Sequence, residues 1–227
     1  MSNNLNDDTV KLMDLKEIDN MLIDMDGVLL DTAYDNYFWQ KHIPEIYARK
    51  NSYDVEQSIK ITHALFNMKK RTKDWYDLNY WSNMLDIDVE KEKLSKQMID
   101  RIKLKQDIIP TLEYLKNKYK LYLVTNAHRR TLDIKLKKFP LQEYFVEIIC
   151  SHELGFIKED IQFWFLLRNK IKVDFERSIL IEDTLDNIKA ASHANLKSIY
   201  ITDNENINDG TIKMKCLSLL PSRLKET

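Results

Sequence analysis

Glycine is scarce in this chain, with 3 residues in 227, and the three positions, Gly27, Gly155 and Gly210, lie far apart. Dinucleotide-binding and P-loop motifs need glycines within a few residues of one another, so the sequence excludes both kinds of phosphate loop. Cysteine is rare too: Cys150 and Cys216 are its only two. Two isolated cysteines are typical of reduced thiols in a cytosolic protein, and their spacing does not predict a zinc site.

The chain also lacks an excess of charge of either sign, because 35 Lys and Arg nearly balance 36 Asp and Glu. Without a positive field we expect neither nucleic acid nor an acidic membrane as a partner. No apolar run approaches the roughly 18 residues that cross a bilayer. The N-terminal stretch from Met1 to Asn20 is polar and shows no signal segment. We therefore expect a cytoplasmic protein, whose 44% of apolar residues can bury a core.

Short apolar runs alternate with helical patterns over most of the chain. This alternation predicts an α/β fold with a parallel sheet covered by helices on both faces. The loops that follow the strands should then line the active site. The expected strands are Asn20–Ile23, Leu121–Val124, Val146–Cys150, Ser178–Ile181 and Ser198–Ile201, and the expected helices are Ile109–Lys118, Thr131–Phe139, Asp160–Lys170 and Thr184–Ala194.

One segment interrupts the alternation, because residues 34–105 show no strand signal. Amphipathic patterns there predict helices over Tyr53–Met68, Lys73–Leu85 and Val89–Leu104, with a turn at Asn51–Ser52. We therefore predict two domains, an α/β core formed by residues 1–33 and 106–227 and a small helical cap formed by residues 34–105.

Acidic residues follow two of the buried strands. Asp24 and Asp26 come directly after the first, and Gly27 then allows a sharp turn. Glu182 and Asp183 follow the strand that begins at Ser178. If the two strands are neighbours, the four acids converge, and clustered carboxylates repel one another unless a cation lies between them. Oxygen ligands of this kind favour Mg²⁺.

Two further segments offer groups that suit a phosphate. Thr125 and Asn126 end the strand Leu121–Val124 with a hydroxyl and an amide. Lys158 lies in a loop or at a helix start, where its ammonium group can neutralise a phosphate and an ionised nucleophile. Taken singly, these residues also fit an ordinary turn, a helix cap and a solvated lysine.

These motifs, in this order from Met21 to Ile201, resemble the haloacid dehalogenase superfamily. The resemblance implies a Rossmann-like core with an inserted helical cap, and a phosphotransferase mechanism. Asp24 is then the nucleophile that becomes an aspartyl phosphate, and Asp26 the general acid and base. Thr125, Asn126 and Lys158 would hold the phosphoryl group. Mg²⁺ would be bound by the Asp24 carboxylate, the Asp26 carbonyl and Asp183, with Glu182 as a direct or indirect ligand.

A closer similarity is to bacterial purine 5′-nucleotidases that act on GMP and IMP. It rests on Asp35–Trp39, Trp75–Trp81, Thr125–His128, Gly155–Asp160 and Ser218–Leu224. The resemblance implies a nucleoside monophosphate as substrate, and the cap residues that we expect to contact it are Asn36, Tyr37, Trp39, Tyr76 and Tyr80. Aromatic residues at helical spacing equally fit core packing.

Three positions depart from the commonest pattern of the superfamily: Val28 replaces a frequent Thr, Ile157 a Pro, and Glu182 an Asp. The extra methylene of Glu182 could shift the metal geometry. Two alternatives stay open from the sequence. One is a sugar phosphatase or a β-phosphoglucomutase-like phosphomutase on the same fold, and the other is a protein that binds without catalysis.

Overall fold

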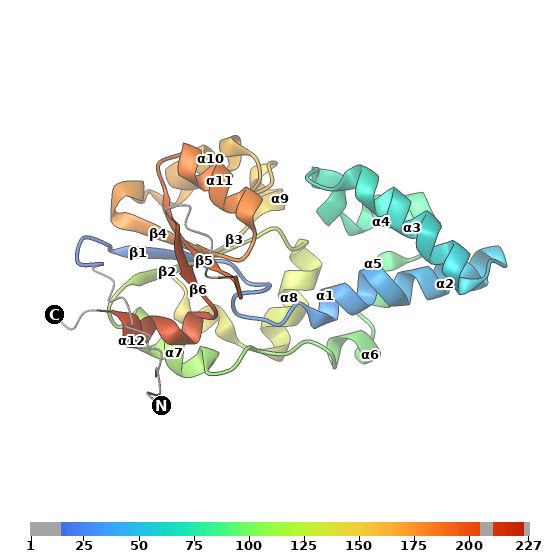
Figure 1. Ribbon diagram of the computed structural model, residues 1–227, viewed down its shortest axis with the longest axis horizontal. Coiled ribbons are helices and arrows are strands. Elements are labelled where there is room, and N and C mark those ends of the chain that lie inside the picture. The colour runs from blue at the N-terminus through green and yellow to red at the C-terminus, as the bar shows by residue number, and fades with distance from the viewer. Residues whose placement is uncertain (1–14, 205–210, 225–227) are drawn as a thin grey trace, which may run out of the picture.

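The computed structural model describes residues 15–204 and 211–224, so most of the polar N-terminal stretch lies outside the described residues. Its centre is one sheet of six parallel strands in the order β3-β2-β1-β4-β5-β6 (Figure 1). The strands are β1 (Asn20–Ile23), β2 (Lys120–Thr125), β3 (Glu147–Cys150), β4 (Ser178–Glu182), β5 (Lys197–Ile201) and β6 (Ile212–Met214). The five predicted strands are confirmed to within a residue at either end. The sequence analysis missed β6, a three-residue strand at the sheet edge.

The sheet is covered on both faces because its strands are apolar on both. Leu22 of β1 packs with Phe163 and Trp164 on one face, whereas Met21 and Ile23 belong to the cluster on the other. The core helices are α7 (Ile108–Lys116), α8 (Arg129–Lys138), α9 (Ser151–Leu154), α10 (Ile161–Ile171), α11 (Leu185–His193) and α12 (Leu220–Arg223). Figure 1 shows α10 and α11 on one side of the sheet and α7 and α12 on the other. The predicted α/β class is confirmed.

A helical insertion follows β1 and extends away from the sheet (Figure 1). Its helices are α1 (Ala33–Tyr37), α2 (Ile43–Asn51), α3 (Val55–Lys69), α4 (Leu78–Leu85), α5 (Val89–Lys93) and α6 (Lys96–Ile99), with a π-helical turn at Phe38–His42 between α1 and α2. The turn predicted at Asn51–Ser52 is confirmed, since Ser52 ends α2 in the left-handed region with φ 56°.

Two helices predicted in the insertion are wrong as single elements. The segment Lys73–Leu85 is divided at Asp77, whose carboxylate accepts hydrogen bonds from the first backbone N–H groups of α4 and so begins a new helix. The segment Val89–Leu104 is divided into α5 and α6 by a break at Leu94 and Ser95, and it is not helical beyond Ile99. Its end is extended instead, because Leu104 pairs with Leu30 in an antiparallel bridge.

That bridge joins the two linkers of the insertion. The Asp31 N–H donates to the Lys103 carbonyl, and the Lys105 N–H donates to the Leu29 carbonyl, both at 2.9 Å. The insertion therefore leaves and re-enters the core at one point.

The insertion has its own apolar centre. Phe66 and Trp81 meet edge to face with centroids 5.0 Å apart, and Trp39 and Trp75 pack around them. Edge-to-face pairs are stabilising beyond their buried area, so this cluster holds the short helices together. None of the helices in the described part of the chain is long and apolar enough to cross a membrane.

The strand order determines where a ligand can bind. From β1 the chain runs through β2 and β3 toward one edge of the sheet, and later through β4, β5 and β6 toward the opposite edge. The direction therefore reverses between β1 and β4, and ligands of open α/β sheets bind at the carboxyl ends of strands at such a point. The acids predicted as a site follow these two strands.

Candidate active site

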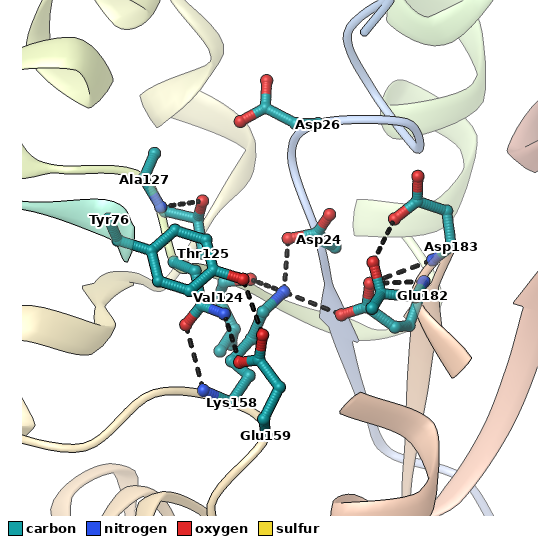
Figure 2. A network of polar contacts seen from close by, with 12 residues as sticks. Asp24, Asp26, Tyr76, Val124, Thr125, Ala127, Lys158, Glu159, Glu182 and Asp183 are labelled. Carbon is teal, nitrogen blue, oxygen red and sulfur yellow. Dashed lines mark hydrogen bonds and ion pairs between the residues drawn. The ribbon is translucent and has the colours of Figure 1, made fainter. Parts of the chain in front are cut away.

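Asp24 lies at the carboxyl end of β1, and its side chain is 7% exposed. The Lys158 ammonium lies between Asp24 Oδ1 at 2.5 Å and Glu182 Oε2 at 2.7 Å, as Figure 2 shows. Strands β1 and β4 are paired in register, so their terminal acids are adjacent. The predicted meeting of these strand ends is therefore present, and Lys158 provides the nearest positive charge.

The loop that carries Lys158 is held by buried hydrogen bonds. The Lys158 ammonium also donates to the Val124 carbonyl at 3.1 Å, and its backbone N–H donates to Asn126 Oδ1 at 3.0 Å. The Trp164 indole donates to the Lys158 carbonyl at 2.8 Å. These contacts hold Lys158 in place although the residue before it is Ile157 and not the proline that is usual in the superfamily. Ile157 is buried, and its N–H donates to the Asp160 carboxylate.

Three acids form a group that could hold a cation. Oxygens of Asp24, Glu182 and Asp183 lie within 4.8 Å of one another. Burial and the neighbouring Glu182 raise the pKa of Asp24 well above its usual range despite Lys158, and burial and Glu182 raise the pKa of Asp183 to about 7. Burial opposes the charge of Lys158, but Asp24 and Glu182 outweigh it and hold its pKa above the ordinary value. One lysine thus does not offset the burial and mutual repulsion of the three carboxylates.

Glu182 is the least available of the three acids. It is fully buried, its Oε2 accepts from Lys158, and its Oε1 accepts the backbone N–H groups of Asp183 and Thr184 at 3.0 Å. Asp24 and Asp183 are the carboxylates better placed to bind a metal ion, and Glu182 braces the lysine and the start of α11.

Gly27 lies against the Asp183 carboxylate. Its φ of +88° is in the left-handed region, and a Cβ added to it would come within 1.7 Å of Asp183 Oδ2. Only a residue without a side chain lets the loop after β1 approach this carboxylate. The backbone around Asp26 and Gly27 therefore forms a close-fitting wall beside the acids.

The prediction that all four acids converge is wrong for Asp26. Figure 2 shows its carboxylate directed away from Asp24 and Asp183. It bonds Lys135 of α8, with Nζ 2.6 Å from Oδ1. The chain leaves the extended conformation at Asp24 and turns at Gly27, so the strand rule that places every second side chain on one face no longer applies. Burial raises the pKa of Asp26, and Lys135 opposes that rise.

Thr125 and Asn126 end β2 as predicted, and both are buried. Thr125 Oγ1 accepts the Ala127 N–H at 3.0 Å, which leaves the hydroxyl proton free to donate. The Asn126 amide is already engaged, because its Nδ2 donates to Glu159 at 2.8 Å and its Oδ1 accepts from Lys158. The Tyr76 hydroxyl donates to the same Glu159 carboxylate at 2.6 Å, which links the insertion to the core.

A cavity of about 520 Å³ lies between the core acids and the insertion. Of the five cap residues predicted to contact substrate, Asn36, Trp39 and Tyr76 line it. Tyr37 and Tyr80 lie elsewhere: the guanidinium of Arg101 covers the Tyr37 ring at 3.7 Å, and Tyr80 packs on Trp81 with centroids 5.1 Å apart.

The sequence analysis missed several residues of the cavity wall. They are Asp35, Gln40, His63, Asn67, Lys93, Lys135, Thr184 and Asn187 among others. One had a detectable signal: Leu132, Lys135 and Leu136 share one face of the predicted helix, and a lysine in an apolar stripe needs a partner. The remainder carry no pattern that separates them from ordinary surface residues.

Comparisons with known proteins show the family of this chain. The family model of the haloacid dehalogenase-like hydrolases matches residues 21–201. The GMP/IMP nucleotidase YrfG of Escherichia coli is 34% identical over 183 residues, which cover 80% of this chain and 82% of that protein. The phosphorylated carbohydrates phosphatase of Thermotoga maritima is 23% identical over 207 residues, 84% of this chain and 87% of that protein.

A solved structure supports the same fold. The crystal structure of a HAD phosphatase from Thermococcus onnurineus superimposes with a TM-score of 0.79, at 21% identity, over 90% of this chain and 97% of that chain. The family expected from the motifs is thereby confirmed. The chain belongs to the haloacid dehalogenase-like hydrolases and is a phosphatase of that family.

Proposed function

We propose that this enzyme hydrolyses purine nucleoside 5′-monophosphates through an aspartyl phosphate on Asp24. The observation that carries the proposal is the pairing of Asp24 with Lys158 in the wall of a cavity that residues of the insertion also line. Its volume, about 520 Å³, falls within the range of about 300–1,000 Å³ that small-molecule sites occupy.

Asp24 is the proposed nucleophile because the Lys158 ammonium bonds only one of its two carboxylate oxygens. Lys158 bonds Oδ1, so Oδ2 is available for attack on phosphorus. Phosphoryl transfer depends on in-line positioning and on neutralisation of charge, and Lys158 contributes to both. The free hydroxyl proton of Thr125 suits a phosphoryl oxygen. Because the Asn126 side chain is engaged, we assign its phosphate contact to the backbone N–H.

Asp26 is the proposed general acid and base. In the first step Asp24 attacks phosphorus, the bond to the sugar oxygen breaks, and Asp26 gives its proton to that oxygen. In the second step water attacks phosphorus, Asp26 takes the water proton, and the bond to Asp24 breaks. Acid–base assistance of this kind is worth about 10²–10⁴-fold for a poor alkoxide leaving group.

The residues fit Mg²⁺. Asp24 and Asp183 supply carboxylate oxygens, and the Asp26 carbonyl is the third proposed ligand. A cation would relieve the repulsion that raises the pKa values of Asp24 and Asp183. When bound, the ion neutralises charge on the nucleophile and on the phosphate. Glu182 is assigned a supporting role through Lys158, because both of its oxygens are already bonded.

A purine base is favoured by the cavity wall and by the relative that acts on GMP and IMP. Trp39 and Trp75 offer aromatic faces or edges, and Gln40 and Asn67 offer amides that can pair with a ring oxygen and its neighbouring N–H. The amides complement the 6-oxo group that guanine and hypoxanthine share.

The test is phosphate release from GMP, IMP, AMP, UMP, CMP and several sugar phosphates, with Mg²⁺ and with EDTA. We expect Mg²⁺-dependent turnover that prefers GMP and IMP. A preference for sugar phosphates would refute the purine assignment, and an isomerised sugar phosphate in place of free phosphate would establish a mutase.

A matched pair of variants tests the nucleophile. Asp24→Asn keeps the shape of the side chain and should abolish turnover and ³²P labelling of the acid-quenched protein. Asp133→Asn, on the exposed face of α8, should leave both unchanged. Full activity of Asp24→Asn would contradict the aspartyl phosphate.

A further inference from the structure

A second buried lysine serves the other acid of the β1 loop. The Lys135 side chain is 1% exposed, and its ammonium lies 2.6 Å from Asp26 Oδ1 and 2.9 Å from Asp35 Oδ2. Burial of an ammonium is costly unless it is paired, so two carboxylates at hydrogen-bond distance fix its place. Lys135 lies on the core helix α8, whereas Asp35 lies on α1 of the insertion.

The pairing continues into the insertion. Asp35 Oδ1 accepts from the Lys93 ammonium at 2.5 Å, and the Lys93 side chain is 5% exposed. The Tyr34 ring lies 5.4 Å from the Lys135 ammonium and 5.3 Å from that of Lys93, and its hydroxyl donates to the Lys93 carbonyl at 2.9 Å. Acids and lysines thus alternate from Asp26 to Lys93 around one tyrosine, and the four charges cancel when Asp26 is ionised.

This arrangement leaves the Asp26 carboxyl group one restrained oxygen and one open oxygen. Among the described residues, Lys135 is the one that bonds this carboxyl group, through Oδ1. The Asp26 side chain is 26% exposed and lines the cavity, so Oδ2 can face a leaving oxygen or a water. A carboxyl group that must give and then take a proton at one place needs its rotation restricted.

We propose that Lys135 is a positioning residue that orients the Asp26 carboxyl group for proton transfer, and that Asp35 and Lys93 of the insertion hold Lys135 in place. The inference rests on the proposed function, in which Asp26 is the acid and base. The inference adds that Asp26 is oriented by Lys135, a core lysine that also bonds Asp35 of the insertion. A different lysine, Lys158, bonds the nucleophile Asp24.

The test separates the two chemical steps with p-nitrophenyl phosphate. Its leaving group departs without a proton, so attack by Asp24 releases p-nitrophenolate whether or not Asp26 is oriented. Water attack on the aspartyl phosphate still needs Asp26 as base. We therefore expect Lys135→Met to retain a burst of about one p-nitrophenolate per site, followed by a steady-state rate about 10²-fold below wild type. On GMP, kcat should fall in the same proportion with little change in KM.

Matched variants make the outcome decisive. Lys137→Met removes an exposed lysine of the same helix and should change neither phase. Asp26→Asn should reproduce the slow steady state, and the double variant with Lys135→Met should be no slower than Asp26→Asn alone, because Lys135 acts through Asp26. Lys135→Gln keeps a donor for Oδ1 and should lose only about tenfold, which retains the test if Lys135→Met does not fold.

Three results would overturn the inference. The first is an unchanged steady-state rate in Lys135→Met or Lys135→Gln. The second is a folded Lys135→Met protein whose burst amplitude falls in the same proportion as its steady-state rate. The third is a double variant of Lys135 and Asp26 whose loss of rate is the product of the losses of the two single variants. Full activity of Asp26→Asn would instead remove the acid–base role in the proposed function, and the inference with it. Failure of the wild type on every phosphomonoester would do the same.

Discussion

The contact between Gly27 and Asp183 gives a sharp test of the proposed metal site. A Cβ at residue 27 would come within 1.7 Å of Asp183 Oδ2, whereas ordinary contacts begin near 3.4 Å. In Gly27→Ala the carboxylate or the loop must therefore retreat by more than an ångström. Metal ligands function within about 0.2 Å of their ideal distances, so the displacement is several times what a ligand tolerates.

The magnitude follows from comparison with a second glycine. Gly27 and Gly155 have φ of +88° and +79°, so alanine is strained at either position by about 1–2 kcal/mol. A Cβ at Gly155 meets nothing within 4 Å, so Gly155→Ala carries the backbone strain alone. The further effect of Gly27→Ala reports the clash with Asp183. We expect Mg²⁺ affinity to fall about 10–100-fold, the loss typical when a ligand loses its positioning.

The assay is calorimetric titration of metal-stripped protein with MgCl₂, together with the Mg²⁺ concentration that gives half-maximal phosphate release. Gly155→Ala should bind Mg²⁺ like the wild type and lose only thermal stability. A Gly27→Ala protein that folds and binds Mg²⁺ within twofold of Gly155→Ala would refute the assignment of Asp183 as a ligand beside Gly27.

Two further outcomes are expected. Tyr76→Phe removes the 2.6 Å hydrogen bond to Glu159 that joins the insertion to the core. The loss of roughly 1.5 kcal/mol should raise KM for a nucleotide about tenfold, with a smaller change in kcat. Tyr53→Phe, on the outer surface of the insertion, should not alter KM. Burial lowers the pKa of His152, whose two ring nitrogens have no hydrogen-bond partner among the described residues. As the pH falls below about 6.5, His152 is therefore protonated in the unfolded chain before it is protonated in the folded protein, and the folded state loses stability. Urea unfolding at pH 7.5 and 5.5 should show a smaller pH-dependent loss for His152→Phe than for wild type or for the exposed variant His193→Gln, and equal losses would contradict this reasoning.

Much of the site could be predicted because strands impose simple geometry. Asp24, Thr125 and Glu182 each end a buried parallel strand, and parallel strands bring such ends to one edge of the sheet. The order of the motifs also identified the family. These expectations needed only local patterns and a rule of topology.

The rest depends on contacts that leave no local pattern. The direction of Asp26 is determined by the turn at Gly27 and by Lys135, which is distant in sequence. In the insertion, Tyr37 and Tyr76 are equally aromatic, but only Tyr76 reaches the cavity, because the packing of short helices decides which ring points inward. The end of the helix predicted at Val89–Leu104 was likewise decided by the bridge to Leu30.

The paired linkers of the insertion have a consequence for how the chain can change. Leu30 and Leu104 are bridge partners, so the whole insertion is a loop closed at its base. The entropy of closing a loop grows only with the logarithm of its length, so lengthening or shortening this segment costs the core little. Residues that select the substrate can therefore be gained or lost in the insertion while β1 and β4 keep their register. The length of the insertion is thus free to vary everywhere except around Asp35 and Lys93, which hold the Lys135 that bonds Asp26.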